Sequence, residues 1–290
     1  MTRLVNSLAV VGTGLIGGSF ALALKEAGAV GEVLGVGRSP ATLEAARALG
    51  ILDRAASFED AARADVILLA LPVGETAAVL AKLAPHLKPG AIVTDAGSTK
   101  SGVVAVARAA LGGRFADFVP GHPIAGSEQS GPAAARADLY RGKKCVLTPT
   151  AETRGEAVAT VRALWQAAGA EVSELSAEAH DRIFAAVSHL PHLAAFALVD
   201  ELAGRADAAA YFSFAASGFR DFTRIAGSSP EMWRDIALAN REALRAELDA
   251  YLAALVSLRD AIEREDAAAL TASFARARDA RAQWMKQQEP

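Results

Sequence analysis

The sequence is poor in cysteine, lacks a long hydrophobic run and carries nearly balanced charge. Its one cysteine, Cys145, has no partner within the 290-residue chain, so an internal disulfide is excluded and we expect a reducing, cytoplasmic location. The longest uninterrupted apolar run, residues 66–73, falls far short of the about 20 residues that cross a bilayer. Lysine and arginine total 30 against 33 aspartate and glutamate, which leaves no positive surplus for binding nucleic acid or an anionic membrane.

Glycine and proline are scarce in the second part of the chain. Of the 24 glycines, 21 lie at or before Gly169, and eight of the 11 prolines lie at or before Pro149. These residues separate short elements, whereas the later region is rich in Ala, Leu, Glu and Arg, which favour helices. We therefore predict two domains, residues 1–175 and residues 176–290.

In the first domain, short apolar runs alternate with helical patterns. The predicted strands are residues 8–11, 33–36, 66–70, 92–94, 118–119 and 145–147, and the predicted helices are residues 19–27, 40–48, 74–83 and 100–111. This alternation is typical of a parallel sheet with helices on both faces. The second domain contains helical stretches at about residues 179–202, 208–219, 230–264 (with a break allowed) and 267–284. The predicted fold is a doubly wound α/β domain followed by an all-helical domain, with Pro191 in a first turn or at a kink.

A glycine-rich turn follows the first predicted strand. Gly12, Gly14 and Gly17 form the pattern G-x-G-x-x-G, in which the first glycine turns the chain, the second admits a pyrophosphate and the third lets the helix pack on the strand. The helix that starts here directs free N–H groups towards the phosphates. The alternative is a purely structural turn, but the strand before the motif and the helix after it favour a dinucleotide site. This part of the chain is thus predicted to be an NAD(P)-binding Rossmann domain.

The end of the second predicted strand bears on the choice between NAD and NADP. An NAD site usually has an acidic residue here for the ribose 2′-OH, and this chain has Gly37 followed by Arg38 and Ser39. Both side chains can donate to a 2′-phosphate, although Arg38 could instead be a solvated turn residue. We expect NADP as the cofactor, with NAD possible. The expected cofactor contacts are Gly12, Gly14, Leu15, Ile16, Gly17, Arg38, Ser39, Leu71, Pro72 and Ser98.

Polar residues follow two further predicted strands. Ser98 lies in the segment 95–100, and His122 lies in the segment 120–128. The carboxyl ends of strands carry the chemistry in open α/β sheets, so we expect both side chains at the reacting end of the cofactor. A histidine beside a proline is often structural, but a second polar strand end in the same sheet favours a general base.

The helical domain contributes a second group of candidate residues. His189 and His192 can share a helix face at a spacing that metal ligands also use, but no nearby cysteine or carboxylate completes a site, and we expect no metal. Arg220 and Arg224 are four residues apart, and a buried arginine in an apolar segment suggests an anionic ligand. The alternative is an internal ion pair with Asp221 or Asp235.

Taken together, these motifs resemble the prephenate/arogenate (cyclohexadienyl) dehydrogenase family of tyrosine biosynthesis. The resemblance extends from Gly12 to about Asn240. It is carried by G-x-G-L-I-G-G-S, D-x-G-S-T-K, H-P-I-A-G, S-H-L-P-H and F-R-D-F-T-R-I-A, at residues 12–19, 95–100, 122–126, 188–192 and 219–226.

The resemblance implies an oxidoreductase that uses NAD(P) for the oxidative decarboxylation of prephenate, arogenate or both. His122 corresponds to the family's general base, which takes the proton of the ring C4 hydroxyl as hydride leaves C4. Ser98 corresponds to the serine that hydrogen-bonds this histidine and the hydroxyl, and Arg224 to the arginine that binds the side-chain carboxylate. The remaining implied substrate contacts are Ser127, Glu128, His189, His192 and Trp233. The resemblance also implies a homodimer formed through the helical domain.

Two rival functions remain as alternatives. A 3-hydroxyacid dehydrogenase that depends on a lysine in its helical part fits poorly, because no lysine occurs between Lys144 and Lys286. A non-catalytic NADP sensor would not need His122 and Ser98 at the strand ends. We expect neither a chorismate mutase segment before Leu8 nor a regulatory domain after Trp284, so that tyrosine feedback would act at the active site. The preference between prephenate and arogenate stays open.

Overall fold

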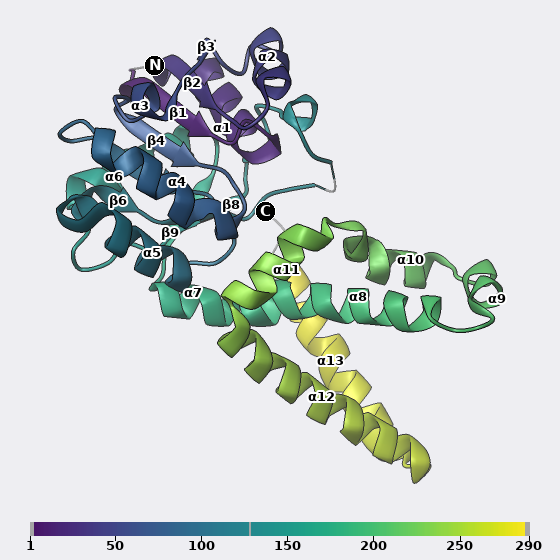
Figure 1. The fold of residues 1–290 in the computed structure, drawn as a ribbon. Coiled ribbons are helices and arrows are strands. Elements are labelled where there is room, and N and C mark those ends of the chain that lie inside the picture. Colours follow the sequence, from purple (N-terminus) through teal and green to yellow (C-terminus); the bar gives the residue numbers. More distant parts are fainter. Residues whose placement is uncertain (1–2, 128, 288–290) are drawn as a thin grey trace. The chain divides into compact units, whose positions relative to one another are not determined.

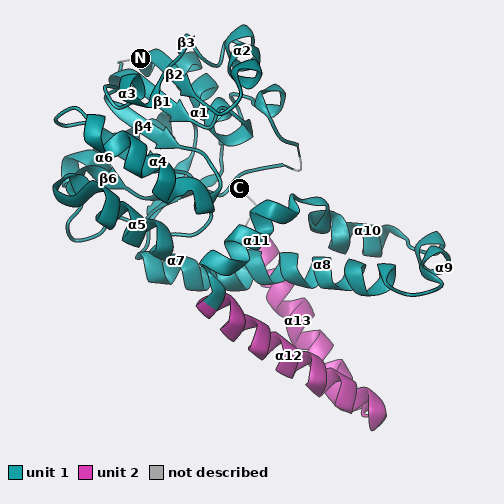
Figure 2. Ribbon diagram, viewed as in Figure 1, with its two compact units in different colours: residues 1–241 teal, residues 242–290 magenta. Residues whose placement is uncertain are grey.

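The computed structural model describes residues 3–127 and 129–287, and these form two compact units (Figures 1 and 2). Unit 1 comprises residues 1–241, and unit 2 comprises residues 242–290. The predicted boundary at residues 175 and 176 falls inside unit 1, in the short loop between strand β9 (Glu171–Glu174) and helix α7 (Ala177–Phe184).

The first part of unit 1 is built around a six-stranded parallel sheet with the order β3-β2-β1-β4-β5-β6. The first three strands are added outwards from β1 on one side, and the next three outwards from β4 on the other side. This strand order is that of a doubly wound dinucleotide-binding domain. The strands are β1 (Val5–Val11), β2 (Val30–Val36), β3 (Arg54–Ala55), β4 (Val66–Leu69), β5 (Ile92–Asp95) and β6 (Phe118–Val119).

Helices cover both faces of this sheet because alternate residues of each strand are buried on opposite sides. On β1, Leu8 and Val10 pack with α1, α2 and α6, whereas Ala9 and Val11 pack with α3, α4 and α5. The helices are α1 (Leu15–Glu26), α2 (Pro40–Ala48), α3 (Phe58–Ala61), α4 (Thr76–Leu83), α5 (Ser101–Leu111) and α6 (Gly155–Ala167). The predicted doubly wound architecture is therefore confirmed.

A second, three-stranded sheet was not predicted. Its strands are β7 (Gly121–Pro123), β8 (Lys144–Leu147) and β9, with β7 antiparallel and β9 parallel to β8. The predicted strand at residues 145–147 thus exists but does not belong to the parallel sheet. Strand β7 is hard to predict because it contains glycine and proline, and β9 because its sequence, EVSE, is polar and mostly exposed. Helix α6 was also missed, although its buried Ala157, Val161, Leu164 and Trp165 have helical spacing.

The remainder of unit 1 is helical, as predicted, but more interrupted. The predicted helix 179–202 consists of α7, a π-helical segment η5 (Ala185–His189) and α8 (Leu190–Ala203), and Pro191 sits in the first turn of α8. The predicted helix 208–219 is two short helices, α9 (Ala208–Ser213) and α10 (Ser217–Thr223), followed by the 3₁₀ turn η6 (Arg224–Gly227). Helix α11 (Pro230–Ala239) completes the unit.

The continuous helix Ala177–Ala203 is long enough and apolar enough to span a membrane by length and composition. Its first half also carries His180, Asp181 and His189, which are buried and hydrogen-bonded to other elements of unit 1. That half therefore packs within unit 1, although only 22% of the apolar window is buried.

Unit 2 consists of α12 (Arg241–Glu263) and α13 (Ala267–Lys286). The turn between the two helices places Glu265 at φ 54°, and the Asp266 side chain caps α13 by accepting the Ala269 N–H at 2.9 Å. The predicted helix 230–264 is therefore two helices, separated at Asn240.

Candidate active site

The glycine motif forms the turn between β1 and α1. Gly12 has φ +97°, and a Cβ atom there would lie 2.1 Å from the Ala70 carbonyl oxygen. A Cβ on Gly17 would lie 2.2 Å from the Gly12 carbonyl oxygen, so this position brings helix and strand together. A Cβ on Gly14 would meet nothing closer than 4.0 Å. The three glycines thus divide into a turn, an open approach and a packing contact, as the motif predicts.

The first turn of α1 is suited to an anion. Gly14 is its N-cap and offers no side-chain acceptor, and no acidic residue lies in the first turn. The N–H groups at this end are therefore available to phosphate oxygens, and the helix dipole favours negative charge. These residues fit a dinucleotide pyrophosphate.

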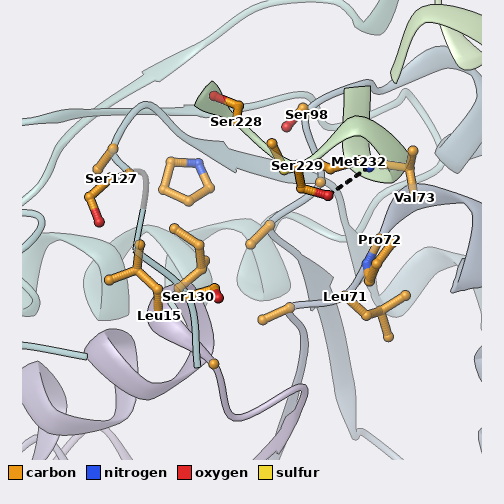
Figure 3. A pocket seen from close by; sticks show the side chains of 18 of the residues that line it. Leu15, Leu71, Pro72, Val73, Ser98, Ser127, Ser130, Ser228, Ser229 and Met232 are labelled. Atoms are coloured by element: carbon orange, nitrogen blue, oxygen red, sulfur yellow. Dashed lines mark hydrogen bonds between the residues drawn. The ribbon is translucent and has the colours of Figure 1, made fainter. Parts of the chain in front are cut away.

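A cavity of about 460 Å³ opens beside this helix end, within the range of small-molecule sites (Figure 3). Its walls come from the glycine loop, the chain after β4, the loop after β5, β7 and the start of α11. The sequence-predicted residues that line it are Gly14, Leu15, Ile16, Leu71, Pro72, Ser98, His122 and Ser127. Sequence reasoning missed its other wall, formed by Ser228, Ser229, Met232 and Ile236, whose one signal is the serine pair before the proline that starts α11.

The residues expected at a 2′-phosphate lie on the exposed edge after β2. The Arg38 side chain is 86% exposed, and its Nη1 lies 3.0 Å from Glu75 Oε1. The Ser39 hydroxyl oxygen accepts the Thr42 N–H and caps α2, which leaves its own O–H free to donate. Neither residue lines the cavity.

His122 lies on β7 and is half-buried. Its Nδ1 lies 2.9 Å from His180 Nε2, and His180 Nδ1 lies 2.9 Å from Asp181 Oδ1. No hydrogen bond joins Ser98 to His122 among the described residues, although both line the cavity. His180 and Asp181 are functional residues that the motifs do not indicate; their local signal is a His-Asp pair in an otherwise helical stretch.

A buried ion pair between Lys100 and Asp95 contacts the backbone of β7 at Gly121. Lys100 Nζ contacts the Asp95 carboxylate and donates to the Gly121 carbonyl oxygen at 2.7 Å. Asp95 also accepts the N–H groups of Gly97 and Gly121, at 2.8 and 3.1 Å. The two charged ends of the D-x-G-S-T-K motif therefore join the end of β5 to the strand that carries His122.

The surroundings of His122 keep its imidazole neutral. Burial lowers its pKa well below 6.5, and the neighbouring His180, Lys100 and His189 lower it further. A neutral imidazole with one lone pair directed at a substrate can act as a general base at pH 7.

A second polar cluster joins α8 and α11. The His192 ring stacks on Trp233 with centroids 3.6 Å apart, and the His189 ring meets the same indole edge-on at 6.0 Å. Asn240 Nδ2 donates both to the Asp181 carbonyl oxygen at 2.8 Å and to His189 Nδ1 at 3.0 Å. Burial lowers the pKa of His189 to about 4.

The position of Arg224 differs from the buried one that the sequence predicts. The residue lies on the short turn η6 and is exposed, not buried, as are most residues of α9 and α10 before it. The suggested internal partners are occupied by other arginines: Asp221 lies 3.8 Å from Arg220, and Asp235 lies 2.7 Å from Arg234. Within the described part of the chain Arg224 forms no ion pair, and its charge lowers the pKa of His192 after the larger effect of burial. Glu128 lies outside the described residues, among which no cluster of three candidate metal ligands occurs.

The sheet has the strand order of a dinucleotide-binding domain, the N-terminus of α1 can bind phosphate, and the neutral His122 lines the adjacent cavity. These features together define an NAD(P)-dependent dehydrogenase. Residues 20–174 match the nucleotide-binding domain of prephenate dehydrogenase, and residues 176–276 match its dimerization domain. The chain belongs to the prephenate dehydrogenase family, which confirms the resemblance.

Related proteins align with almost the whole chain. A prephenate dehydrogenase of Bacillus subtilis is 38% identical over 97% of this chain and 76% of its own length. A cyclohexadienyl dehydrogenase of Zymomonas mobilis is 37% identical over 94% of both proteins. The crystal structure of prephenate dehydrogenase from A. aeolicus, in complex with hydroxyphenyl propionate and NAD+, superposes with a TM-score of 0.90 at 38% identity and covers 96% of this chain and 98% of that one.

Proposed function

We propose that this protein catalyses the NAD(P)-dependent oxidative decarboxylation of prephenate, arogenate or both, with His122 as the general base. The observation that carries the assignment is a neutral, half-buried imidazole in the wall of the dinucleotide cleft. The names of the relatives support the substrate class.

In this reaction the bound nicotinamide supplies the hydride acceptor. His122 takes the proton of the ring hydroxyl as the C4–H bond gives its electron pair away. The ring carboxylate then leaves as CO2, and the electrons of the broken C–C bond complete the aromatic ring. Ser98 lines the same cavity as His122 (Figure 3), so its hydroxyl is available to hydrogen-bond the substrate hydroxyl. Arg224 does not line the cavity, but it is exposed four residues before Ser228, which does, and it forms no ion pair within the described residues, so its charge is available for the side-chain carboxylate.

The test is His122→Asn, which removes the base while keeping a polar side chain of similar reach. We expect kcat to fall by about two to four orders of magnitude, the usual contribution of a positioned base. NADPH affinity, measured by fluorescence titration, should stay within about twofold because the cofactor contacts are untouched. Near-normal kcat would remove His122 from the mechanism.

We further propose that NADP is preferred to NAD. Gly37 provides no carboxylate to repel a 2′-phosphate, and Arg38 and the Ser39 hydroxyl can donate to one. A contact of this kind contributes about 1–3 kcal/mol, or roughly ten- to a hundredfold in kcat/KM. Glu75 now holds Arg38, so Glu75→Gln should strengthen the preference.

The cofactor proposal is tested by comparing kcat/KM for NAD and NADP. The double variant Gly37→Asp, Arg38→Ile should shift the ratio towards NAD. Equal or higher kcat/KM with NAD in the unmodified protein would refute the preference and leave the catalytic proposal intact.

We also propose a homodimer formed through the helical residues. The family model for this region is described as a dimerization domain, and apolar side chains such as Phe214, which is 88% exposed, lie uncovered there. Light scattering coupled to gel filtration should give twice the 29.9 kDa chain mass, and a monomer would contradict this.

A further inference from the structure

We propose that Asp181 and His180 set the tautomer of His122, so that Nε2 of His122 is the atom that accepts the substrate proton. The two residues are positioning residues, because they act through His122 and do not line the cavity. This inference rests on the proposed role of His122 as the general base.

The direction of the hydrogen bonds begins at the Asp181 carboxylate. Its Oδ1 accepts the Lys100 N–H at 2.7 Å, and its Oδ2 accepts the Ser101 N–H at 2.8 Å. Burial alone would raise the pKa of Asp181, but hydrogen bonds from His180, Ser101 and Lys100 outweigh it and hold that pKa below its ordinary value. An ionised carboxylate can only accept, so His180 must donate its Nδ1–H to Asp181 Oδ1.

The proton on His180 Nδ1 fixes the next bond in the chain. His180 is fully buried, and burial lowers its pKa, so the ring is neutral at pH 7 and its Nε2 carries a lone pair. That lone pair faces His122 Nδ1 at 2.9 Å, which must therefore carry the hydrogen. Only Nε2 of His122 is then left with a lone pair for the substrate.

The surrounding contacts hold this chain of groups in place. The start of α5 fixes the Asp181 carboxylate through Lys100 and Ser101, and Asn240 holds the Asp181 carbonyl oxygen. The Phe184 ring packs against both imidazoles, at 5.0 Å from His122 and 4.5 Å from His180. Rotation of either imidazole is therefore restricted before substrate arrives.

Protonation of His122 is influenced by groups from several elements. Burial has the largest effect and lowers the pKa of His122, and His180, Lys100 and His189 lower it further. Asp95 lies against Lys100, and Asp181 lies against His180. The imidazole is therefore neutral, and the hydrogen bond from its Nδ1 to His180 decides which nitrogen carries the lone pair.

The tautomer itself can be observed by NMR of the protein labelled with ¹⁵N-histidine. We expect the His122 hydrogen on Nδ1 in the unmodified protein and on Nε2 in His180→Leu, with His122→Asn used to assign the signals. This measurement needs no turnover, so it separates the tautomer from the catalytic role. A hydrogen on Nε2 in the unmodified protein, or an unchanged tautomer in His180→Leu, would overturn the proposal.

Kinetics of a matched pair of variants provide the second test. Glutamine at position 180 offers an amide oxygen that can accept from His122 Nδ1, whereas leucine of similar size offers none. We expect His180→Leu to lower kcat about 10- to 1,000-fold with little change in KM, and His180→Gln to recover at least fivefold of that loss.

The remaining outcomes are also decisive. Equal kcat for His180→Leu and His180→Gln, or losses that follow the melting temperatures of the two variants, would mean that His180 is only structural. Normal activity of His122→Asn would instead refute the base assignment, while the NMR result would still report the tautomer.

Discussion

Lys100→Met offers the sharpest test of the buried ion pair beneath the site. The Lys100 and Asp95 side chains are 0% and 3% exposed. Methionine has nearly the same length but no charge, so the substitution leaves Asp95 buried with only the backbone donors of Gly97 and Gly121. Removing one partner of a buried pair costs about 3–5 kcal/mol, because the other charge remains without compensation.

The matched control is Lys25→Met. Lys25 and Asp53 are paired at 2.8 Å, but their side chains are 31% and 41% exposed. An exposed pair of this kind contributes about 0–1 kcal/mol. Free energies of unfolding from urea titrations followed by circular dichroism should therefore separate the two variants by at least about 2 kcal/mol.

A double variant completes the comparison. Asp95→Asn combined with Lys100→Met removes both charges and should recover part of the loss, since replacing a whole buried pair is often nearly neutral. The reasoning is refuted if Lys100→Met loses no more stability than Lys25→Met.

Three further outcomes are expected. The pKa of His189 is about 4 in the folded chain against an ordinary 6.5, so the stability that it contributes is complete above pH 6.5 and declines towards pH 4. This residue alone should lower the free energy of unfolding by about 2 kcal/mol between pH 7.5 and pH 5. His189→Gln should reduce the pH dependence by about that amount and leave the share of His122 and His180, whose pKa values are also lowered. Gly17→Ala forces a Cβ to within 2.2 Å of the Gly12 carbonyl oxygen and should destabilise by about 1–3 kcal/mol and weaken NADPH binding, whereas Gly102→Ala meets nothing within 4 Å and should be neutral or stabilising; similar melting temperatures would contradict this. Arg224→Ala should raise KM about tenfold or more with a smaller change in kcat, and a lower melting temperature with unchanged KM would mean that the arginine is structural.

The parallel sheet could be predicted because its strands are buried on both faces and read as continuous apolar runs. On β4 every residue from Val66 to Leu69 is buried, and the glycine motif fixes where the first turn lies. Gly14, Leu15 and Ile16 of the glycine loop line one cavity with Ser98 and His122, because the strands that precede these residues are parallel and end at one edge of the sheet.

The partners of His122 could not be predicted in this way. His180 is 58 residues away along the chain, and Asp181 reaches the Lys100 N–H across 81 residues. Nothing in the local sequence indicates such pairings, because they depend on how α7 packs against the start of α5. The apolar neighbours of Arg224 predict a buried arginine, but some of those neighbours, such as Phe214 and Phe222, are exposed as well.

The π-helical segment η5 explains how Asp181 and His189, on the same continuous helix, can both contact Asn240. Asp181 and His189 are eight residues apart, about 2.2 α-helical turns, which would direct them about 80° away from each other. The wide turn at residues 185–189 takes up about one residue, so that the effective spacing approaches two whole turns. A single Asn240 amide can then hold both positions. The extra residue in the π-helical turn therefore sets the rotation of α8 relative to α7. Deleting one residue from 185–189 would give a more regular helix in which His180 and His189 could not both face their partners, His122 and Asn240.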